Sequence, residues 1–570
     1  ALAERLSQAI GAAGRGAAGR GSSDVGTPLG EGVNASLSAQ LAQLYNAEEG
    51  GFSRGQQFPQ ESFLLWLLDH WRRTGDHAAL GVALHSLKAI EAGGLHDHAG
   101  GGFHRYTVDV NWRTPHFEKM LYNQAQLTRA MVGGWQATGE AAFARAARRA
   151  CAYVLAEMTV PDGPLAGAFF AAEDADSLDA EGQREEGAFY AWTPGQVRDA
   201  FAGEPDEAAW AIATLGIDQA PTIDAGAVAH LTPGATAGWG DGEWCRLDGV
   251  LERLKQARAV RARPIRDEKI IVGWNGLMIR ALAEAGEALD APDLTAAAAR
   301  AGEAIWSELI LDGRLVRLSA EGETREEGLL EDHAWYGLAC LALFGATGNG
   351  TWRERALWCG EQAATRFAAN NGRLRMAAAD GPLGPVFEAQ DGATPSGESA
   401  ALELLARLAR LEASPTLTAV AGRLVQALSP SLSQEPVARP DAVAAVRLLD
   451  GGESGLCRHL AAGAVRARLV RSGAADGTAV LHLVIAPGWT LAAPVGGDGG
   501  DETGTGGVEA ISIAGAMADW PAGAPSDAGP VYRGSVAIPL RIARPVVTLT
   551  IQACGDGFCR APEQALFRLG

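Results

Sequence analysis

The segment "SFLLWLLDHWRRTGDHAALGVALHSLKAIEAGG", residues 62–94, contains two helix-length apolar stretches separated by a short polar turn. In the turn "RRTGD", residues 72–76, a Gly stands where a helix can end in the left-handed conformation, and an Asp stands where the next helix needs a cap. The same phrase recurs as "QATGE" at 136–140 and "GATGN" at 345–349. The pattern predicts a helical hairpin that is repeated along the chain.

Two further hinges, "ALDAPDL" at 288–294 and "LEASPTL" at 411–417, give the repeat a period of roughly 60 residues. The first helix of several pairs is strongly apolar, as in "AWYGLACLALFG" at 334–345, whereas the second is more charged, as in "TWRERALWCGEQAATRF" at 351–367. Concentric rings of inner and outer helices produce such an alternation. Five or six hairpins of this kind predict a mainly α fold, an (α/α)6 barrel or six-hairpin toroid.

Beyond about residue 465 the pattern changes to short runs rich in β-branched residues, such as "GTAVLHLVIAPGWTL" at 477–491 and "RPVVTLTIQACG" at 544–555. Gly and Pro turns separate these runs, which indicates a small antiparallel β-sandwich. The predicted domains are a linker or flexible N-terminus at 1–35, the barrel at 36–430, a helical connector at 431–464 and the β domain at 465–570.

The chain of 570 residues carries a net charge of -20. This charge disfavours nucleic acid and anionic membrane surfaces as partners. No apolar run is long enough to cross a bilayer. "HDHAGGGFH", residues 96–104, holds three His without a carboxylate at a fixed offset, so we expect no metal site there. No motif calls for a cofactor.

Polar residues crowd the predicted start of one inner helix, "TPHFEKMLYNQAQL" at 114–127. Its Thr-Pro pair suits an N-cap followed by the first helical position, and His116, Lys119 and Asn123 would then share a helix face. Similar clusters precede the other apolar helices. Because inner helices of a barrel point the same end at one mouth, we expect these clusters to converge there.

The acid/base groups expected at this mouth are His116, Glu118, Asp174, Asp176 and Asp267. The ligand-binding groups expected there are His104, Arg105, Trp112, Tyr122, Asn123, Glu173, Trp274, Asn275, Asp332, Ser396 and Glu398. Aromatic rings stack on sugar faces, and acids and amides bind hydroxyls, so a carbohydrate-like small molecule is the expected ligand. Two carboxylates would suit glycoside hydrolysis, and a His pair would suit proton transfer in epimerisation.

Cys554 and Cys559 lie five residues apart around a Gly-containing turn near the end of the chain. Two Cys so placed can close a disulfide when their Cβ atoms face each other. Three alternatives stay open at this point: a redox-active pair, a structural staple and two unpaired thiols. A redox-active pair would make a thioredoxin-like protein a partner, and would leave the compartment either cytoplasmic or periplasmic.

Four long motifs resemble one family. They are "GGGFHRYTVDVNWRTPHFEKMLYNQAQL" at 100–127, "AAEDADS" at 171–177 followed by "EEGAFYAWT" at 185–193, "RPIRDEKIIVGWNGLMIRALA" at 263–283 and "PSGESAALELLARLA" at 395–409. The chain is similar here to the thioredoxin-domain-containing proteins related to spermatogenesis-associated protein and bacterial YyaL. The resemblance implies an (α/α)6 barrel like those of sugar 2-epimerases and six-hairpin glycosidases. The family's N-terminal thioredoxin-like domain is not among the 570 residues of this sequence, so we expect that it was lost, was removed, or lies upstream of Ala1.

The tail is similar to a different protein. "LHLVIAPGWTLAAP" at 481–494, "VYRGSVAIPLRI" at 531–542 and "VTLTIQACGDGFCRAPEQALFRL" at 547–569 resemble the N-terminal domain of the thiol:disulfide interchange protein DsbD. That resemblance implies an immunoglobulin-like sandwich in which Cys554 and Cys559 exchange disulfides. Two functions are therefore expected: acid/base chemistry on a carbohydrate-like ligand, or a thiol-redox module with the barrel as its scaffold.

Overall fold

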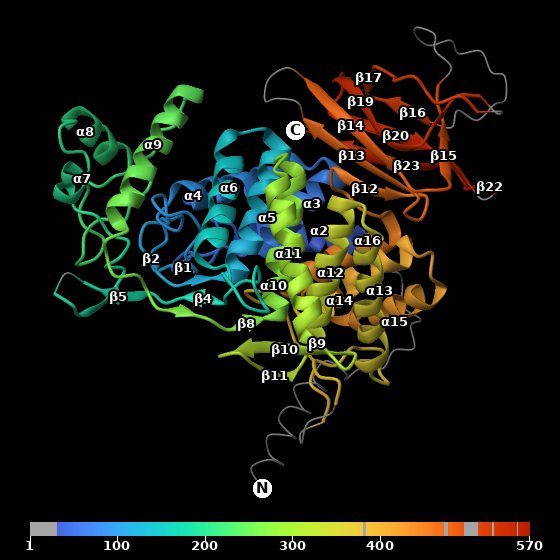
Figure 1. Ribbon diagram of the computed structural model, residues 1–570, viewed down its shortest axis with the longest axis horizontal. Helices are drawn as coiled ribbons and strands as arrows, with labels where there is room; N and C mark the ends of the chain where they lie inside the picture. The colour runs from blue at the N-terminus through green and yellow to red at the C-terminus, as the bar shows by residue number, and fades with distance from the viewer. Residues whose placement is uncertain are drawn as a thin grey trace.

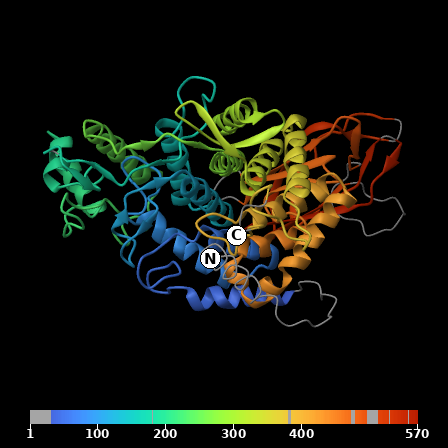
Figure 2. The ribbon, with the colours of Figure 1, turned by 90° about the horizontal axis from the view of Figure 1, so that it is seen from below.

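The computed structural model describes residues 31–179, 181–379, 384–471, 477–494, 511–526, 529–555 and 557–569. Residues 1–30 of the predicted linker lie outside this part of the chain. The described chain folds into a helical barrel, a small helical lobe and a β domain, with the lobe and the β domain on opposite sides of the barrel (Figures 1 and 2).

Six helices form the inner ring of the barrel. They are α3 (Glu61–Thr74), α5 (Leu121–Thr138), α10 (Val272–Ala288), α12 (Leu330–Thr347), α14 (Gly397–Leu411) and α16 (Pro440–Gly451). Each contacts the next in this order, and α16 contacts α3 to close the ring. The outer helices are α2 (Glu31–Leu44), α4 (His77–Ala92), α6 (Ala141–Glu157), α11 (Pro292–Leu309), α13 (Gly350–Arg366) and α15 (Pro415–Gln434). The predicted (α/α)6 barrel is confirmed.

The repeated turn sequence ends one helix and caps the next, as predicted. Gly75, Gly139 and Gly348 end inner helices with φ of 78°, 73° and 70°, a conformation that costs Gly little. The side chain of Asp76 then accepts the first amides of α4, and Asn349 does the same for α13. Inner helices are therefore followed by tight turns at their C-terminal ends, the short-loop end of the barrel. Their N-terminal ends receive the long connections and form the long-loop end.

Residues 431–464, predicted as a helical connector, divide between the barrel and the β domain. Helix α16 is the sixth inner helix, because its Ala442, Val443 and Ala445 are buried in the barrel core. Strand β12 (Cys457–Leu460) pairs with β13 (Val465–Arg471) in the β domain. The local pattern predicts the helix, whereas its place in the ring depends on contacts with α3 and α14.

The β domain contains three antiparallel arrays around a separate core. The first array is β12, β13, β14 (Thr478–Ile485), β19 (Gly534–Ile542) and β17 (Ala516–Ala518); the second is β16 (Ile511–Ala514), β20 (Val546–Ile551) and β23 (Glu563–Arg568); the third is β18 (Val531–Tyr532), β15 (Trp489–Ala492), β21 (Ala553–Gly555) and β22 (Phe558–Cys559). Alternating residues of β14 are buried, as a half-buried strand requires. The domain covers the short-loop end of the barrel, where Arg468 donates to the Glu287 carbonyl.

The long connection between α6 and α10 forms the lobe. Its helices α7 (Pro194–Ala200), α8 (Pro205–Thr214) and α9 (Asp241–Arg258) enclose a small core of their own. Among the described helices, none combines the length and apolarity that a bilayer crossing requires.

A buried ion network attaches the lobe to the barrel. The Asp97 carboxylate accepts from Lys119 Nζ at 2.8 Å and from both terminal nitrogens of Arg258, also at 2.8 Å. All three side chains are at most 5% exposed. Burial by itself raises the pKa of Asp97, but the Arg258 and Lys119 charges hold this pKa well below its usual range.

Close helix packing gives the first testable prediction. A Cβ atom at Gly276 in α10 would lie 2.7 Å from backbone atoms of Trp335 and Tyr336 in α12. Gly276→Ala must push the two inner helices apart, so we expect it to lower the free energy of unfolding by about 1–3 kcal/mol in chemical denaturation. Gly81→Ala is the control, since Gly81 is exposed in α4 with no atom near its Cβ position. That variant should stabilise by about 0.5–1 kcal/mol. Equal effects of the two variants would contradict the packing.

Asp97→Asn should lower the free energy of unfolding by about 3–5 kcal/mol, because it leaves two buried cations without their counter-charge. The pKa of Asp97 is depressed in the folded state, so its contribution is complete above the unfolded value of about 3.9 and is lost as pH falls through the folded pKa. The deficit of the variant should therefore stay constant from pH 7 to about pH 5 in denaturant titrations. Glu140→Gln, which breaks an exposed pair with Lys88, should cost less than about 1 kcal/mol. A deficit no larger than that of the control would disprove the role of Asp97.

Candidate functional site at the long-loop end

The segment predicted to start a helix at Thr114 is extended, and α5 begins only at Leu121. The Asp109 carboxylate accepts the backbone amides of Arg113 and Thr114 at 2.9 and 2.6 Å. The loop, and not a helix, therefore satisfies these amides. Local capping signals predicted the helix start, but a side chain five residues upstream competes for the same donors.

Two strand pairings keep the following residues extended. Strand β2 (Pro115–His116) pairs with β1 (Tyr106–Thr107), and β3 (Lys119–Met120) pairs with β4 (Ala172–Glu173). The predicted helix face shared by His116, Lys119 and Asn123 does not form. Lys119 instead points into the buried network with Asp97.

His116 lies at the centre of a cluster of charged side chains. Its Nδ1 lies 2.7 Å from Glu186 Oε1, and its Nε2 lies 3.8 Å from Glu118 Oε2. Arg105 donates to Glu118, with its Nη1 3.1 Å from Glu118 Oε2. The His116 ring also stacks on Tyr106 at 5.1 Å. The side chains of Arg105, His116 and Glu118 are 39%, 28% and 27% exposed, so all three can reach a ligand.

An aromatic pair adjoins this cluster. The rings of Tyr122 and Trp274, from the first turns of α5 and α10, meet edge to face at 4.9 Å. Behind them the Asn123 amide donates to Glu61 Oε1 at 2.8 Å. Burial raises the pKa of Glu61 to about 7, although the bond from Asn123 lowers it.

Other predicted acids lie at the rim. Strand β5 (Asp176–Leu178) pairs with β6 (Arg184–Glu186), which places Asp176 opposite Glu186. Arg184 lies 3.0 Å from Asp174 and 3.7 Å from Asp176. Asp267 forms an exposed pair with Lys269 at 2.9 Å. The two predicted acids of this hairpin thus share one arginine, and Glu186 connects the hairpin to His116.

Several predicted ligand-binding residues are buried in structural contacts. His104 Nδ1 lies 2.9 Å from the Phe117 carbonyl, and burial lowers the pKa of His104 to about 3. Asn275 is fully buried and bonds to both the amide and the carbonyl of Phe169. Trp112 Nε1 donates to the Glu49 carbonyl, and Glu173 accepts from Tyr153 and Arg263.

The predicted residues on α12 and α14 hold their helices in place. Asp332 accepts the amides of Gly273 and Leu329, and burial raises its pKa to about 7. Ser396 caps α14. Glu398, 1% exposed, accepts from Arg373 and from the Leu374 amide. Of the predicted residues, the structure therefore brings together Arg105, His116, Glu118, Tyr122, Asn123 and Trp274, with the Asp174 and Asp176 hairpin beside them.

Sequence analysis missed Glu61 and Glu186. Glu61 occupies the first turn of inner helix α3, the same place as the other clusters. This position at the start of an inner helix could have been recognised in the sequence. Glu186 had no such signal, because its contact with His116 spans 70 residues.

A cavity of about 1290 Å3 lies at the opposite end of the ring. All six inner helices and the β domain line it, and none of the residues predicted for the mouth does. Among the described residues, no group of three or more His, Cys, Asp or Glu side chains is placed to hold a metal ion.

Solved structures with a similar arrangement include cellobiose 2-epimerase from Bacillus thermoamylovorans B4167, with a TM-score of 0.46, 10% identity and coverage of 70% of this chain and 85% of that one. D-mannose isomerase gives a TM-score of 0.45 with 10% identity and the same coverage. The GH76 α-mannanase of Bacteroides thetaiotaomicron gives 0.44 with 9% identity, covering 74% of this chain and 94% of that one.

No family model matches the chain. An uncharacterized protein of Caenorhabditis elegans is 27% identical over 448 residues, 72% of this chain and 61% of the relative. Human spermatogenesis-associated protein 20 is 32% identical over 457 residues, 73% of this chain and 58% of the relative. The chain thus spans less than two thirds of the length of these curated relatives. Across 73% of its length, the chain is similar in sequence to human spermatogenesis-associated protein 20.

Proposed function

We propose that the long-loop end of the barrel binds a carbohydrate-like ligand and that His116 transfers a proton to or from it. The observation that carries this proposal is the contact of His116 with Glu186 and Glu118 beside the Tyr122 and Trp274 rings. These side chains come from two connections, α4–α5 and α6–α10, and from two inner helices, α5 and α10.

The geometry around His116 suits a general acid/base. A carboxylate on Nδ1 fixes the tautomer of a neutral imidazole, so that Nε2 carries the free lone pair. Nε2 lies on the side of Glu118, whose carboxylate is held by Arg105. A positioned His of this kind contributes about 10²–10⁴-fold to a proton transfer. Because Glu118 is committed to an ion pair with Arg105, proton transfer in an epimerisation or isomerisation fits better than a carboxylic-acid step in glycoside hydrolysis.

The other groups of the cluster fit the binding of hydroxyls. Arg105 and Glu118 supply donors and acceptors, and the Trp274 ring supplies a partly buried apolar face. Asp174, Asp176 and Asp267 stand at the rim, where they would bind hydroxyls of a longer ligand. Glu61 positions Asn123 and the first turn of α5 from behind.

The test is calorimetric titration of the full chain with a panel of mono- and disaccharides. We expect at least one sugar to bind, and Trp274→Ala to weaken that binding about 3- to 10-fold through loss of the ring contact. Trp239→Ala is the matched control, since Trp239 is a partly buried ring in the lobe. The absence of binding by every sugar, or equal losses in both variants, would reject the site.

His116→Gln separates catalysis from binding. The variant should bind the same sugar within about threefold, but solvent deuterium incorporation into that sugar, followed by NMR, should fall by about 10²–10⁴-fold. Asp267→Asn at the rim is the control and should keep most of the exchange. Exchange that is unaffected in His116→Gln would remove the proton-transfer role and leave a binding site.

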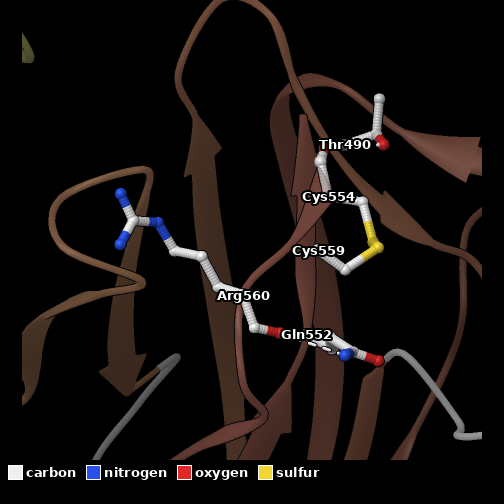
Figure 3. Close-up of a disulfide and its surroundings, with 5 residues drawn as sticks. All are labelled: Thr490, Gln552, Cys554, Cys559 and Arg560. Atoms are coloured by element: carbon white, nitrogen blue, oxygen red, sulfur yellow. Dashed lines mark hydrogen bonds between the residues drawn. A yellow bond between two sulfur atoms is a disulfide. The ribbon is translucent and has the colours of Figure 1, made fainter. Parts of the chain in front are cut away.

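A second function is favoured by the position of the Cys pair. Cys554 and Cys559 face each other on β21 and β22 and form a disulfide at the edge of the β domain (Figure 3). Cys559 is exposed, and its neighbour Phe558 is 52% exposed. Thr490 and Gln552 hold the two adjoining strands by bonds to the carbonyls of Cys554 and Arg560. We propose that this accessible disulfide exchanges with a thioredoxin-like protein.

This proposal is tested by a redox titration of the full chain against glutathione, with thioredoxin as the protein reductant. We expect reduction of Cys554–Cys559 by thioredoxin and no change of the barrel signal in circular dichroism. Closing so short a loop stabilises by at most about 2 kcal/mol, so Cys559→Ser should remove the exchange with only a small loss of stability. A disulfide that resists thioredoxin, or a variant that fails to fold, would identify the pair as a structural staple.

A further inference from the structure

The cavity at the short-loop end is separate from the cluster around His116. Its walls are the six inner helices, mainly their C-terminal halves but with Asp441 from the first turn of α16, and its roof is formed by β12, β13 and β23 of the β domain. The lining is rich in charge, although the cavity is buried between two domains. Charged side chains at such a place need either partners or a ligand.

Six of the eight acids in the cavity lining have arginine partners. Their ion pairs are Asp69 with Arg73 at 2.8 Å, Glu284 with Arg129 at 2.7 Å, Glu403 with Arg280 at 2.7 Å, Glu453 with Arg407 at 2.8 Å, Glu563 with Arg410 at 3.8 Å, and Glu287 with Arg466. The other two are Asp450, which is exposed, and Asp441, whose Oδ2 is buried without a hydrogen bond. Burial and the neighbouring Asp391 raise the pKa of Asp441 to about 8, so it adds little negative charge at neutral pH.

Four arginines in the same lining have no acidic partner. Within the part of the chain that the structure describes, no carboxylate oxygen lies within 4.0 Å of Arg72, Arg458, Arg468 or Arg568. Their bonds go to neutral oxygens: Arg72 to the Gln136 amide at 2.9 Å, Arg468 to the Glu287 carbonyl at 2.9 Å, Arg568 to the Arg72 carbonyl at 3.3 Å, and Arg458 to the Leu566 carbonyl. The cavity thus has an excess of positive charge inside a chain of net charge -20.

Arg458 is the most constrained of the four. Its side chain is 7% exposed, and its Nε is buried without a partner. Burial, together with the charges of Arg73 and Arg72 and against the attraction of Glu453, lowers the pKa of Arg458 to about 10. Burial also lowers the pKa of Arg72. Both guanidinium groups are therefore desolvated cations that lack a counter-charge of their own.

We infer that this cavity binds a small organic phosphate. Guanidinium groups match the geometry and charge of phosphate, and several of them without carboxylate partners favour a multiply charged anion. The ion pairs on the inner helices offer further donors and acceptors to ligand hydroxyls, and Trp66 and Trp135 supply apolar surface. A volume of about 1290 Å3 exceeds that of a metabolite-sized ligand and leaves space for water.

A purely structural explanation makes a different prediction. The inner helices direct the negative ends of their dipoles at this cavity, and arginines there could serve only to cap carbonyl groups. In that case, removal of one arginine would lower stability. If the arginines await an anion, removal of one relieves an unpaired buried charge, so the free protein keeps or gains stability while the ligand affinity falls.

The test uses the full chain with pyrophosphate and inorganic phosphate as probes, in thermal unfolding and calorimetry at fixed ionic strength set with NaCl. We expect pyrophosphate to raise the melting temperature and to bind at least tenfold more weakly to Arg72→Gln, whose melting temperature without ligand should not fall. Arg468→Gln is the second variant, and should also lose at least tenfold in affinity. Arg54→Gln, on the exposed surface, and Trp274→Ala, at the opposite end, should bind pyrophosphate as the parent chain does.

Three outcomes would overturn the inference. They are the absence of a shift beyond that of matched NaCl, pyrophosphate affinity that is unchanged in both arginine variants, and melting temperatures without ligand that fall in both variants. The last outcome would assign the arginines to helix capping. Loss of sugar binding at the long-loop end would leave this inference unaffected, because the two sites share no residue.

Discussion

One buried carboxylate holds the long-loop end of the barrel together. Asp97 lies in the connection before α5, Lys119 lies just ahead of α5, and Arg258 ends α9 of the lobe. Tyr153 and Tyr190 place their rings 4.2 and 4.9 Å from the Lys119 ammonium, which completes its enclosure. A low-dielectric site of this kind is stable only when every charge is satisfied, so the three segments can adopt only one mutual arrangement. The contact between His116 and Glu186 depends on that arrangement.

The fold followed from the sequence because its determinants are local and repeated. Glycines at the turns and alternating apolar and charged helices predicted the barrel, and the structure confirms it. The start of α5 could not be obtained in the same way, since the loop carboxylate of Asp109 binds the amides that a helix cap would have used. Residues of the candidate site could be predicted from the sequence where they lie just before, or in the first turn of, an inner helix. The role of Glu186 and the arginine-lined cavity could not be predicted, because both depend on contacts between segments that are distant in sequence.

The six inner helices give the barrel two chemically different ends. Their N-terminal ends carry positive partial charge and meet Glu61, Asp332 and Glu398, all in first turns. Their C-terminal ends carry negative partial charge and meet arginines from α3, α14 and the β domain. The side chains of each end thus oppose the sign of the helix dipole. At the short-loop end, four of the described arginines have no carboxylate within 4.0 Å, and this end faces the β domain.

Closure of the ring also depends on the order in which its helices are synthesised. The seam between α3 and α16 is held by bonds such as that from Arg73 to the Gly452 carbonyl, which spans 379 residues. At a synthesis rate of about 5–20 residues per second, α16 is completed roughly 20–80 s after α3. Throughout that interval the apolar side of α3 that later packs against α16 is unburied on the nascent chain. The seam is therefore the place where this barrel is most open to a wrong neighbour, such as the α16 of another molecule made alongside it.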